Sequence, residues 1–140
     1  MTKEMAKSIK LKNNKYWDSS SISHNRKNLK SMLNSIGKVY SVGFSDVETK
    51  AETTSNIIAS LTLPAGNYVV RGFFYAAVYD YRCIISVHNA VSVVYDPNGW
   101  VNGSITDIVE CNVESTISFA LGYGTKDALV SGNLYAIKIK

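Results

Sequence analysis

The stretch LPAGNYVVRGFFYAAVY, residues 63–79, decides the fold of this chain. It opens on the turn Pro64-Ala65-Gly66-Asn67, in which Pro presets φ and Gly or Asn tolerates a positive φ. From Tyr68 onward the side chains alternate between two faces, and both faces are apolar except at Arg71. A period of two predicts a β-strand, and two apolar faces indicate that neither face contacts water.

The same period continues on both sides of this stretch. Turn residues separate the apolar runs, as in Asp96-Pro97-Asn98-Gly99, and short strands broken by turns about every 8 to 12 residues are typical of a sandwich or barrel. No helical period interrupts them, which disfavours a parallel α/β sheet. We therefore predict an all-β domain with eight strands, near residues 38–44, 57–63, 67–79, 82–88, 91–95, 100–111, 115–123 and 133–140.

The first 37 residues have a different pattern and are predicted to form a stem, leaving 38–140 as the head domain. A short extended segment precedes a predicted amphipathic helix over 23–36, and Gly37 is well placed to end it with a positive φ. A helix of about three turns with one narrow apolar stripe is marginal alone in water. It needs the downstream domain or copies of itself around a symmetry axis to cover its stripe, which consists of Leu29, Met32, Leu33 and Ile36.

Strands with two dry faces also predict association between subunits. Interface cores are enriched in aromatic residues and depleted of charge, and several strands here carry aromatic residues on a face that a single sheet would leave wet. We expect a homotrimer; the alternative is a closed single-chain barrel with an aromatic outer face. The predicted interface combines the helix stripe with Phe73, Tyr75, Phe119, Leu121, Tyr135 and Ile137.

Composition narrows the possible function. The chain has 140 residues, of which 46% are hydrophobic and 19% charged, as in a folded globular protein. Residues 1–38 hold eight Lys and one Arg against two acidic residues, whereas the remainder holds six basic and nine acidic side chains. The basic segment lacks interleaved aromatic residues, so we expect a solvated or partner-facing stem and no nucleic-acid partner.

Two further features bear on location and redox state. No apolar run approaches the roughly 20 residues of a membrane-spanning helix, and the start lacks the apolar region of a signal peptide, so no membrane association is expected. Cys83 and Cys111 lie inside apolar strand-like runs, RCIISV and DIVECNV. Buried reduced thiols are expected there, and a disulfide between neighbouring strands is the alternative.

The sequence does not predict an enzyme, a metal site or a cofactor. It contains none of the common catalytic or metal-binding motifs. Asp107 and Glu110 stand three apart on a predicted strand and therefore point to opposite faces, which argues against a glycosidase pair.

A binding surface is easier to build from this sequence. Saccharide sites place an aromatic ring against the apolar face of a sugar and polar groups at its hydroxyls. The loop residues Tyr79, Asp80, Tyr81 and Arg82 form one such group, while Asp96, Asn98 and Trp100, beside Tyr95, form another, and His88 is a further possible sugar contact. The alternative for each aromatic residue is packing in a core or an interface.

These residues resemble two known kinds of protein. The stem, with SIKLKNN at 8–14, YWDSSSI at 16–22, His24-Asn25 and LNSIG at 33–37, resembles the linker of tail and baseplate proteins of phages that infect low-GC Gram-positive bacteria. The head, with LPAGNYVV at 63–70 and the closing SGNLYAIKIK at 131–140, is similar to trimeric jelly-roll heads of the C1q and tumour-necrosis-factor type.

The resemblance implies a trimeric jelly-roll receptor-binding or adhesin head in the virion, on a phage tail or baseplate. Such a protein would be made in the host cytoplasm, would contact other phage tail proteins and would bind a host cell-wall or surface polysaccharide. The alternative is a purely structural trimerising module that docks neighbouring tail proteins.

Overall fold

The computed structural model describes residues 35–140. The chain divides into two units, 1–36 and 37–140, and the second is called the jelly-roll unit below. Leu29, Met32, Leu33 and nearly all of the predicted helix lie outside the described residues. Within the jelly-roll unit the chain forms eight strands: β1 (Val39–Thr49), β2 (Asn56–Leu63), β3 (Gly66–Ala76), β4 (Tyr81–Val87), β5 (Ala90–Asp96), β6 (Val101–Cys111), β7 (Ser115–Gly122) and β8 (Ala128–Lys138).

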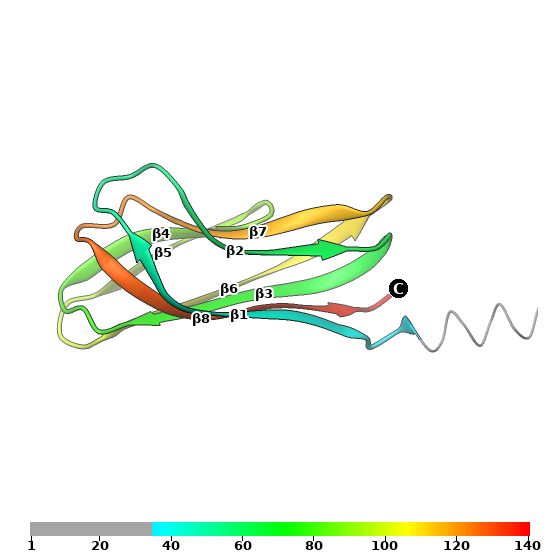
Figure 1. The fold of residues 1–140 in the computed structure, drawn as a ribbon, viewed down its shortest axis with the longest axis horizontal. Helices are drawn as coiled ribbons and strands as arrows, with labels where there is room; N and C mark the ends of the chain where they lie inside the picture. The colour runs from blue at the N-terminus through cyan, green and yellow to red at the C-terminus, as the bar shows by residue number, and fades with distance from the viewer. Residues whose placement is uncertain (1–34) are drawn as a thin grey trace, which may run out of the picture. The chain divides into compact units, whose positions relative to one another are not determined.

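The strands form two four-stranded antiparallel sheets packed face to face (Figure 1). The first sheet has the order β1-β8-β3-β6 and the second the order β2-β7-β4-β5. Every connection except the β4–β5 hairpin passes from one sheet to the other, which gives the strand arrangement of a jelly roll. The predicted all-β sandwich is therefore confirmed.

Three strand boundaries differ from the sequence prediction by three residues or more. β1 continues past Phe44 through a segment predicted as a loop, because a bulge carries it around Asp46. β3 ends at Ala76 rather than residue 79, and β8 begins at Ala128 rather than residue 133. A bulge adds a residue that breaks the alternation, so the period of two cannot reveal a strand that continues beyond one.

The core lies between the sheets and is built from one alternating face of each strand. Phe74 of β3 and Phe119 of β7 face each other across it, with ring centroids 6.4 Å apart. Gly72 allows this packing, since a Cβ there would lie 2.7 Å from the Phe119 ring. Leu121 follows on the same face of β7, and both it and Phe119 are fully buried.

Phe119 and Leu121 were therefore wrongly assigned to the subunit interface. Their apolar face of β7 fills the interior of the unit, while the small residues Ser118 and Ala120 lie on its outer face. The predicted thiols are confirmed, since Cys83 and Cys111 are both buried and free. Burial raises the pKa of the Cys83 thiol to about 12.

The outer face of the first sheet carries one row of apolar residues. The strand registers align one residue from each of its four strands, which gives an outer row of Val39, Ile137, Val69 and Ile108. Val39 and Ile108 are 57% and 69% exposed. Beyond this row, Arg71, Phe73, Asn133 and Tyr135 line a depression of about 300 Å³ on the same face.

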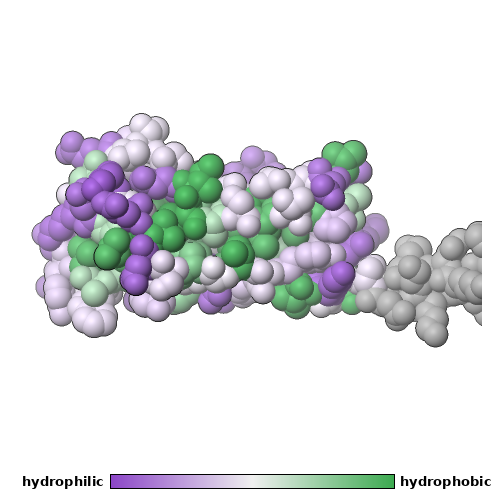
Figure 2. All heavy atoms as spheres, in the orientation of Figure 1, coloured by the Kyte–Doolittle hydropathy of each residue, from purple (hydrophilic) through white to green (hydrophobic). Residues whose placement is uncertain are grey.

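A second apolar surface lies along one side of the unit. Figure 2 shows hydrophobic atoms between the two layers, on the side where β1 and β2 are the edge strands. The residues of β1 that pack against the core, Tyr40, Val42, Phe44 and Val47, are only partly buried. The core is therefore less completely covered at β1 than at the inner strands.

Candidate functional site

Four loops gather at one end of the jelly-roll unit (Figure 1). This loop end comprises residues 50–55, 77–80, 97–100 and 123–127, which connect β1–β2, β3–β4, β5–β6 and β7–β8. The chain enters the unit at Gly37 at the opposite end, where Gly37 N–H donates a hydrogen bond to the carbonyl of Lys138. The loop end is therefore the end of the strands that lies opposite Gly37, where the chain enters the unit.

The first sheet splits at the loop end. β3 and β8 pair as far as Tyr75 and Ser131 and then separate. β3 stays with β6 to the pair Ala76 and Val101, while β8 stays with β1 to the pair Thr49 and Ala128. The sheet therefore divides into two wings, and the space between them is a pocket of about 610 Å³, which we call the wedge pocket.

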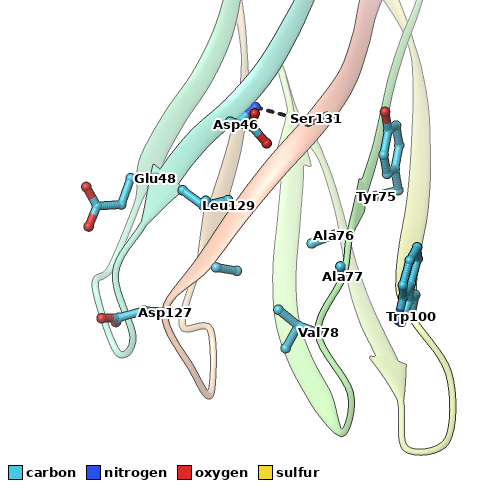
Figure 3. Close-up of a pocket in the computed structure, with 11 residues that line it drawn as sticks. Asp46, Glu48, Tyr75, Ala76, Ala77, Val78, Trp100, Asp127, Leu129 and Ser131 are labelled. Atoms are coloured by element: carbon cyan, nitrogen blue, oxygen red, sulfur yellow. Dashed lines mark hydrogen bonds between the residues drawn. The ribbon is translucent and has the colours of Figure 1, made fainter.

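Gly132 marks the point where the wings part. A Cβ at this position would overlap the Phe73 carbonyl oxygen and lie 2.9 Å from the Phe74 Cα, so only glycine allows β8 to lie this close to β3. Opposite it, the register between β1 and β8 shifts between Phe44 and Val47. Asp46 occupies the bulge with a φ of 52°, and its N–H donates to the Ser131 Oγ at 3.0 Å (Figure 3).

The walls of the wedge pocket differ in chemistry. Tyr75 and Trp100 stand on the β3/β6 side, and Ala76, Ala77 and Val78 lie between the wings (Figure 3). The two aromatic side chains are 51% and 59% exposed. Rings that remain uncovered beside a floor of small residues leave room for a flat ligand.

Acidic residues lie on the β1/β8 side of the wedge pocket. Asp46, Glu48 and Asp127 contribute to its lining together with Leu129. Lys50 pairs with Glu48 and lies 3.8 Å from the Asp127 carboxylate. The hydrogen bond to Glu48, followed by the nearby negative charges, raises the pKa of Lys50. The acidic side chains on this side supply oxygen acceptors.

A second pocket, of about 620 Å³, lies at the same end on the side of the other sheet. We call it the Tyr95 pocket. Asp80, Arg82, Val93, Tyr95, Thr125 and Lys126 line it. The Tyr95 hydroxyl donates to the Asp80 carboxylate at 3.3 Å, and the negative charge of Asp80 raises the pKa of Tyr95.

The structure separates the residues that the sequence grouped as ligand contacts. Trp100 lines the wedge pocket, whereas Asp80 and Arg82 line the Tyr95 pocket. Tyr79 is 57% exposed between them, and its carbonyl accepts a hydrogen bond from the Lys126 Nζ at 2.7 Å. These four positions remain accessible to a ligand at the loop end.

Tyr81 is not accessible, and its assignment as a ligand contact was wrong. It points into the core at 0% exposure, and desolvation raises its pKa to about 12. The start of β4 sets this direction, because Tyr81 and Cys83 share the inward face while Arg82 lies on the outward one. Sequence reasoning missed this because it took Tyr81 for a loop residue.

Asp96 and Asn98 are taken up by the turn that precedes Trp100. The Asp96 Oδ1 accepts hydrogen bonds from the N–H groups of Asn98 and Gly99, at 3.1 and 2.9 Å. This side-chain to backbone pattern fixes a turn. Asp96 therefore supports the position of Trp100 and lines neither pocket, while the Asn98 side chain stays exposed beside it.

His88 lies outside the loop end. It occupies the β4–β5 hairpin turn, six residues from Arg82, or about 20 Å along an extended strand. Its Nδ1 lies 2.9 Å from the Oδ2 of Asp107 on β6, which joins the two sheets. His88 is too far from the loop end to share a ligand with Trp100 or Arg82, and its assignment as a sugar contact stays a prediction.

The wedge pocket also contains residues that sequence reasoning did not assign to a site. Asp46 and Glu48 fell in a predicted loop, Tyr75 was assigned to the interface, and Asp127 had no assigned role. Their assembly depends on the bulge and on the separation of β3 from β8, and neither has a local sequence signal apart from Gly132. Among residues 35–140, no group of three or more His, Cys, Asp or Glu side chains is arranged to hold a metal ion.

Comparison with known proteins leaves the family open. No protein-family model matches the chain, and no curated protein matches it. Among solved structures, VP2 from the infectious bursal disease virus subviral particle matches 72% of this chain at 11% identity with a TM-score of 0.49. This chain covers 33% of the VP2 chain, about a third of its length.

Two other solved structures are similar at the same level. The PRD1 vertex protein P5 matches 75% of this chain and 99% of its own at 17% identity, with a TM-score of 0.42. The C-terminal CBM6 of LamC, a marine laminarinase from Zobellia galactanivorans, matches 71% of this chain and 100% of its own at 15% identity, with a TM-score of 0.37. Scores this low do not assign a family or a function.

The part of the chain that the structure describes contains no helix long and apolar enough to cross a bilayer.

Proposed function

We propose that this protein binds a saccharide in the wedge pocket, as a receptor-binding or adhesin head in a phage tail or baseplate. The observation that carries the proposal is the pair Tyr75 and Trp100, both more than half exposed, beside a pocket of about 610 Å³ at the loop end. Pockets of roughly 300 to 1,000 Å³ are typical of small-ligand sites.

The chemistry of the wedge pocket suits a sugar. An aromatic ring offers a flat apolar surface to the C–H face of a pyranose, and carboxylates accept hydrogen bonds from its hydroxyls. Asp46, Glu48 and Asp127 supply such acceptors at the rim of the pocket, where the Glu48 and Asp127 carboxylates point away from the two rings (Figure 3). Because the residues at the floor of the pocket are small, the space between the wings is open and no side chain has to change rotamer to admit a ligand.

The virion setting is supported by the sequence resemblance of the stem to the linker of phage tail and baseplate proteins, whereas the head is similar to trimeric jelly-roll heads of the C1q and tumour-necrosis-factor type. In such a setting the loop end would face the cell surface, because the chain enters the jelly-roll unit at the opposite end. The ligand would be a cell-wall or surface polysaccharide of the host. Other phage tail proteins would contact the stem.

In this proposal the protein is a homotrimer, and its subunits associate through the outer face of the first sheet. Val39, Val69, Ile108 and Ile137 form the outer row on this face, and covering such an exposed apolar surface in a neighbouring copy removes it from water. Of the predicted interface residues, Phe73, Tyr135 and Ile137 lie in or beside this row, while Tyr75 lies on the same face nearer the loop end, where it lines the wedge pocket outside the proposed interface. Ile36, which is 48% exposed, precedes the unit.

The same face favours a second candidate function, a structural module that trimerises and docks neighbouring tail proteins. A glycan array separates the two. The saccharide proposal expects full-length protein to bind a subset of bacterial glycans and Trp100→Ala to weaken that binding by about tenfold, or about 1.4 kcal/mol. Tyr123→Ala is the matched control, because Tyr123 is 55% exposed at the same end and lines neither pocket.

Unchanged glycan binding by Trp100→Ala would reject the wedge pocket as the site. Absence of any glycan binding by a folded wild-type trimer would leave the structural module as the better function.

A further inference from the structure

The Tyr95 pocket is built differently from the wedge pocket. Its walls come from the outward face of the β4–β5 hairpin and from the β7–β8 loop. Arg82 and Tyr95 are cross-strand partners in the β4–β5 ladder, so their side chains lie next to each other on that face. Val93, two residues before Tyr95, continues the apolar part of the wall.

Hydrogen bonds hold the β7–β8 loop against this wall. The Thr125 N–H donates to the Arg82 carbonyl at 3.0 Å, and the Arg82 N–H donates to the Thr125 Oγ1 at 3.1 Å. Lys126 Nζ donates to the Tyr79 carbonyl at 2.7 Å. The pocket is thus formed before any ligand arrives, which lowers the entropic cost of binding.

The charges that line the Tyr95 pocket are mainly positive. Arg82 and Lys126 contribute two cations, whereas Asp80 is the one acidic residue in the lining, and it already accepts a hydrogen bond from Tyr95. The wedge pocket, in contrast, has three acidic residues in its lining. The two pockets therefore differ in the sign of the charge that predominates in their linings.

We propose that the Tyr95 pocket binds an oxyanion, either a carboxylate or a phosphate, carried by a sugar. The Arg82 guanidinium presents a planar set of N–H donors that matches two oxygens of such a group. Lys126 adds a second charge, and the Thr125 hydroxyl can donate its own proton while it accepts from Arg82. The exposed ring of Tyr95 supplies the apolar surface against which the sugar packs.

Titration of full-length protein with matched monosaccharides tests this assignment. Isothermal titration with glucuronate, glucose 6-phosphate and neutral glucose should show binding of at least one acidic sugar and weaker binding of glucose. Arg82→Gln should weaken the acidic sugar by about tenfold, as the loss of one charge-assisted contact implies. Arg71→Gln, which removes the same charge from an exposed position on the other sheet, should leave the affinity unchanged.

Equal affinities of Arg82→Gln and Arg71→Gln for the acidic sugar would overturn the proposal, as would failure of the wild-type protein to bind either acidic sugar. The two acidic ligands distinguish a carboxylate site from a phosphate site. Trp100→Ala should retain acidic-sugar binding, so the outcome is independent of the wedge pocket.

Discussion

Gly132→Ala tests how the wedge pocket is made. The new methyl group would lie 2.9 Å from the Phe74 Cα and from the Phe73 carbonyl carbon, and would overlap the Phe73 carbonyl oxygen. Ordinary contact begins at 3.4 Å, and the obstructing atoms belong to the backbone of β3, which cannot rotate away. Either β3 or β8 must therefore move, and backbone shifts forced by overpacking lower the free energy of unfolding by about 1 to 3 kcal/mol. We expect a loss of about 2 kcal/mol.

Urea unfolding at a fixed protein concentration measures this loss. With a slope of about 2 kcal/mol per molar urea, Gly132→Ala should lower the midpoint by about 1 M. Gly43→Ala on the neighbouring strand is the matched control, since its methyl group would meet the Asn133 side chain at an ordinary 3.4 Å. Equal midpoints for the two variants would refute the argument that close approach of β3 and β8 requires glycine.

Three further outcomes are expected. In light scattering, Ile108→Asp should convert the proposed trimer to monomer. Val113→Asp, at a loop position that is 70% exposed against 69% for Ile108, should not. An Ile108→Asp protein that remained trimeric would exclude the outer face as the interface. Phe119→Ala should lower the free energy of unfolding by about 3 to 5 kcal/mol, because it empties the core, and a loss below 1 kcal/mol in urea denaturation would place the ring elsewhere. The hydrogen bond from His88 lowers the pKa of Asp107. Asp107→Asn should therefore lower the free energy of unfolding by about 1 kcal/mol at pH 7. This deficit should vanish as the pH falls below 3.8, the ordinary pKa of the carboxyl, because acid then protonates the wild-type carboxylate. A deficit that persists unchanged at pH 2 would contradict the ionic origin.

The strands could be predicted because burial on alternate faces leaves a direct trace in the sequence. All eight predicted runs correspond to strands, and the turns at Pro64 and Pro97 separate the elements as their chemistry requires. The pairing order of the sheets depends on contacts between distant segments, which no local period encodes. The sequence therefore predicted the strands and the jelly-roll class, the latter by resemblance, and no pairing order.

The candidate sites were only partly predictable for a related reason. The sequence correctly indicated three pocket residues, because polar and aromatic residues at the ends of predicted strands suggest a binding loop. These are Trp100, Asp80 and Arg82. Tyr81 was misplaced by one position along the strand, and in a strand one position reverses the face to which a side chain points. Tyr75 lines the wedge pocket because β8 separates from β3 beside it, which the period of the sequence does not indicate.

Amide chemical-shift mapping with a glycan bound by the wild-type protein locates the saccharide site. The largest shifts should fall on the lining of the wedge pocket, at Ala76, Ala77, Trp100 and Leu129, while the amides of the β4–β5 hairpin turn stay unchanged. Shifts concentrated at that turn or along the outer row of the first sheet, with none in the wedge pocket, would contradict this location.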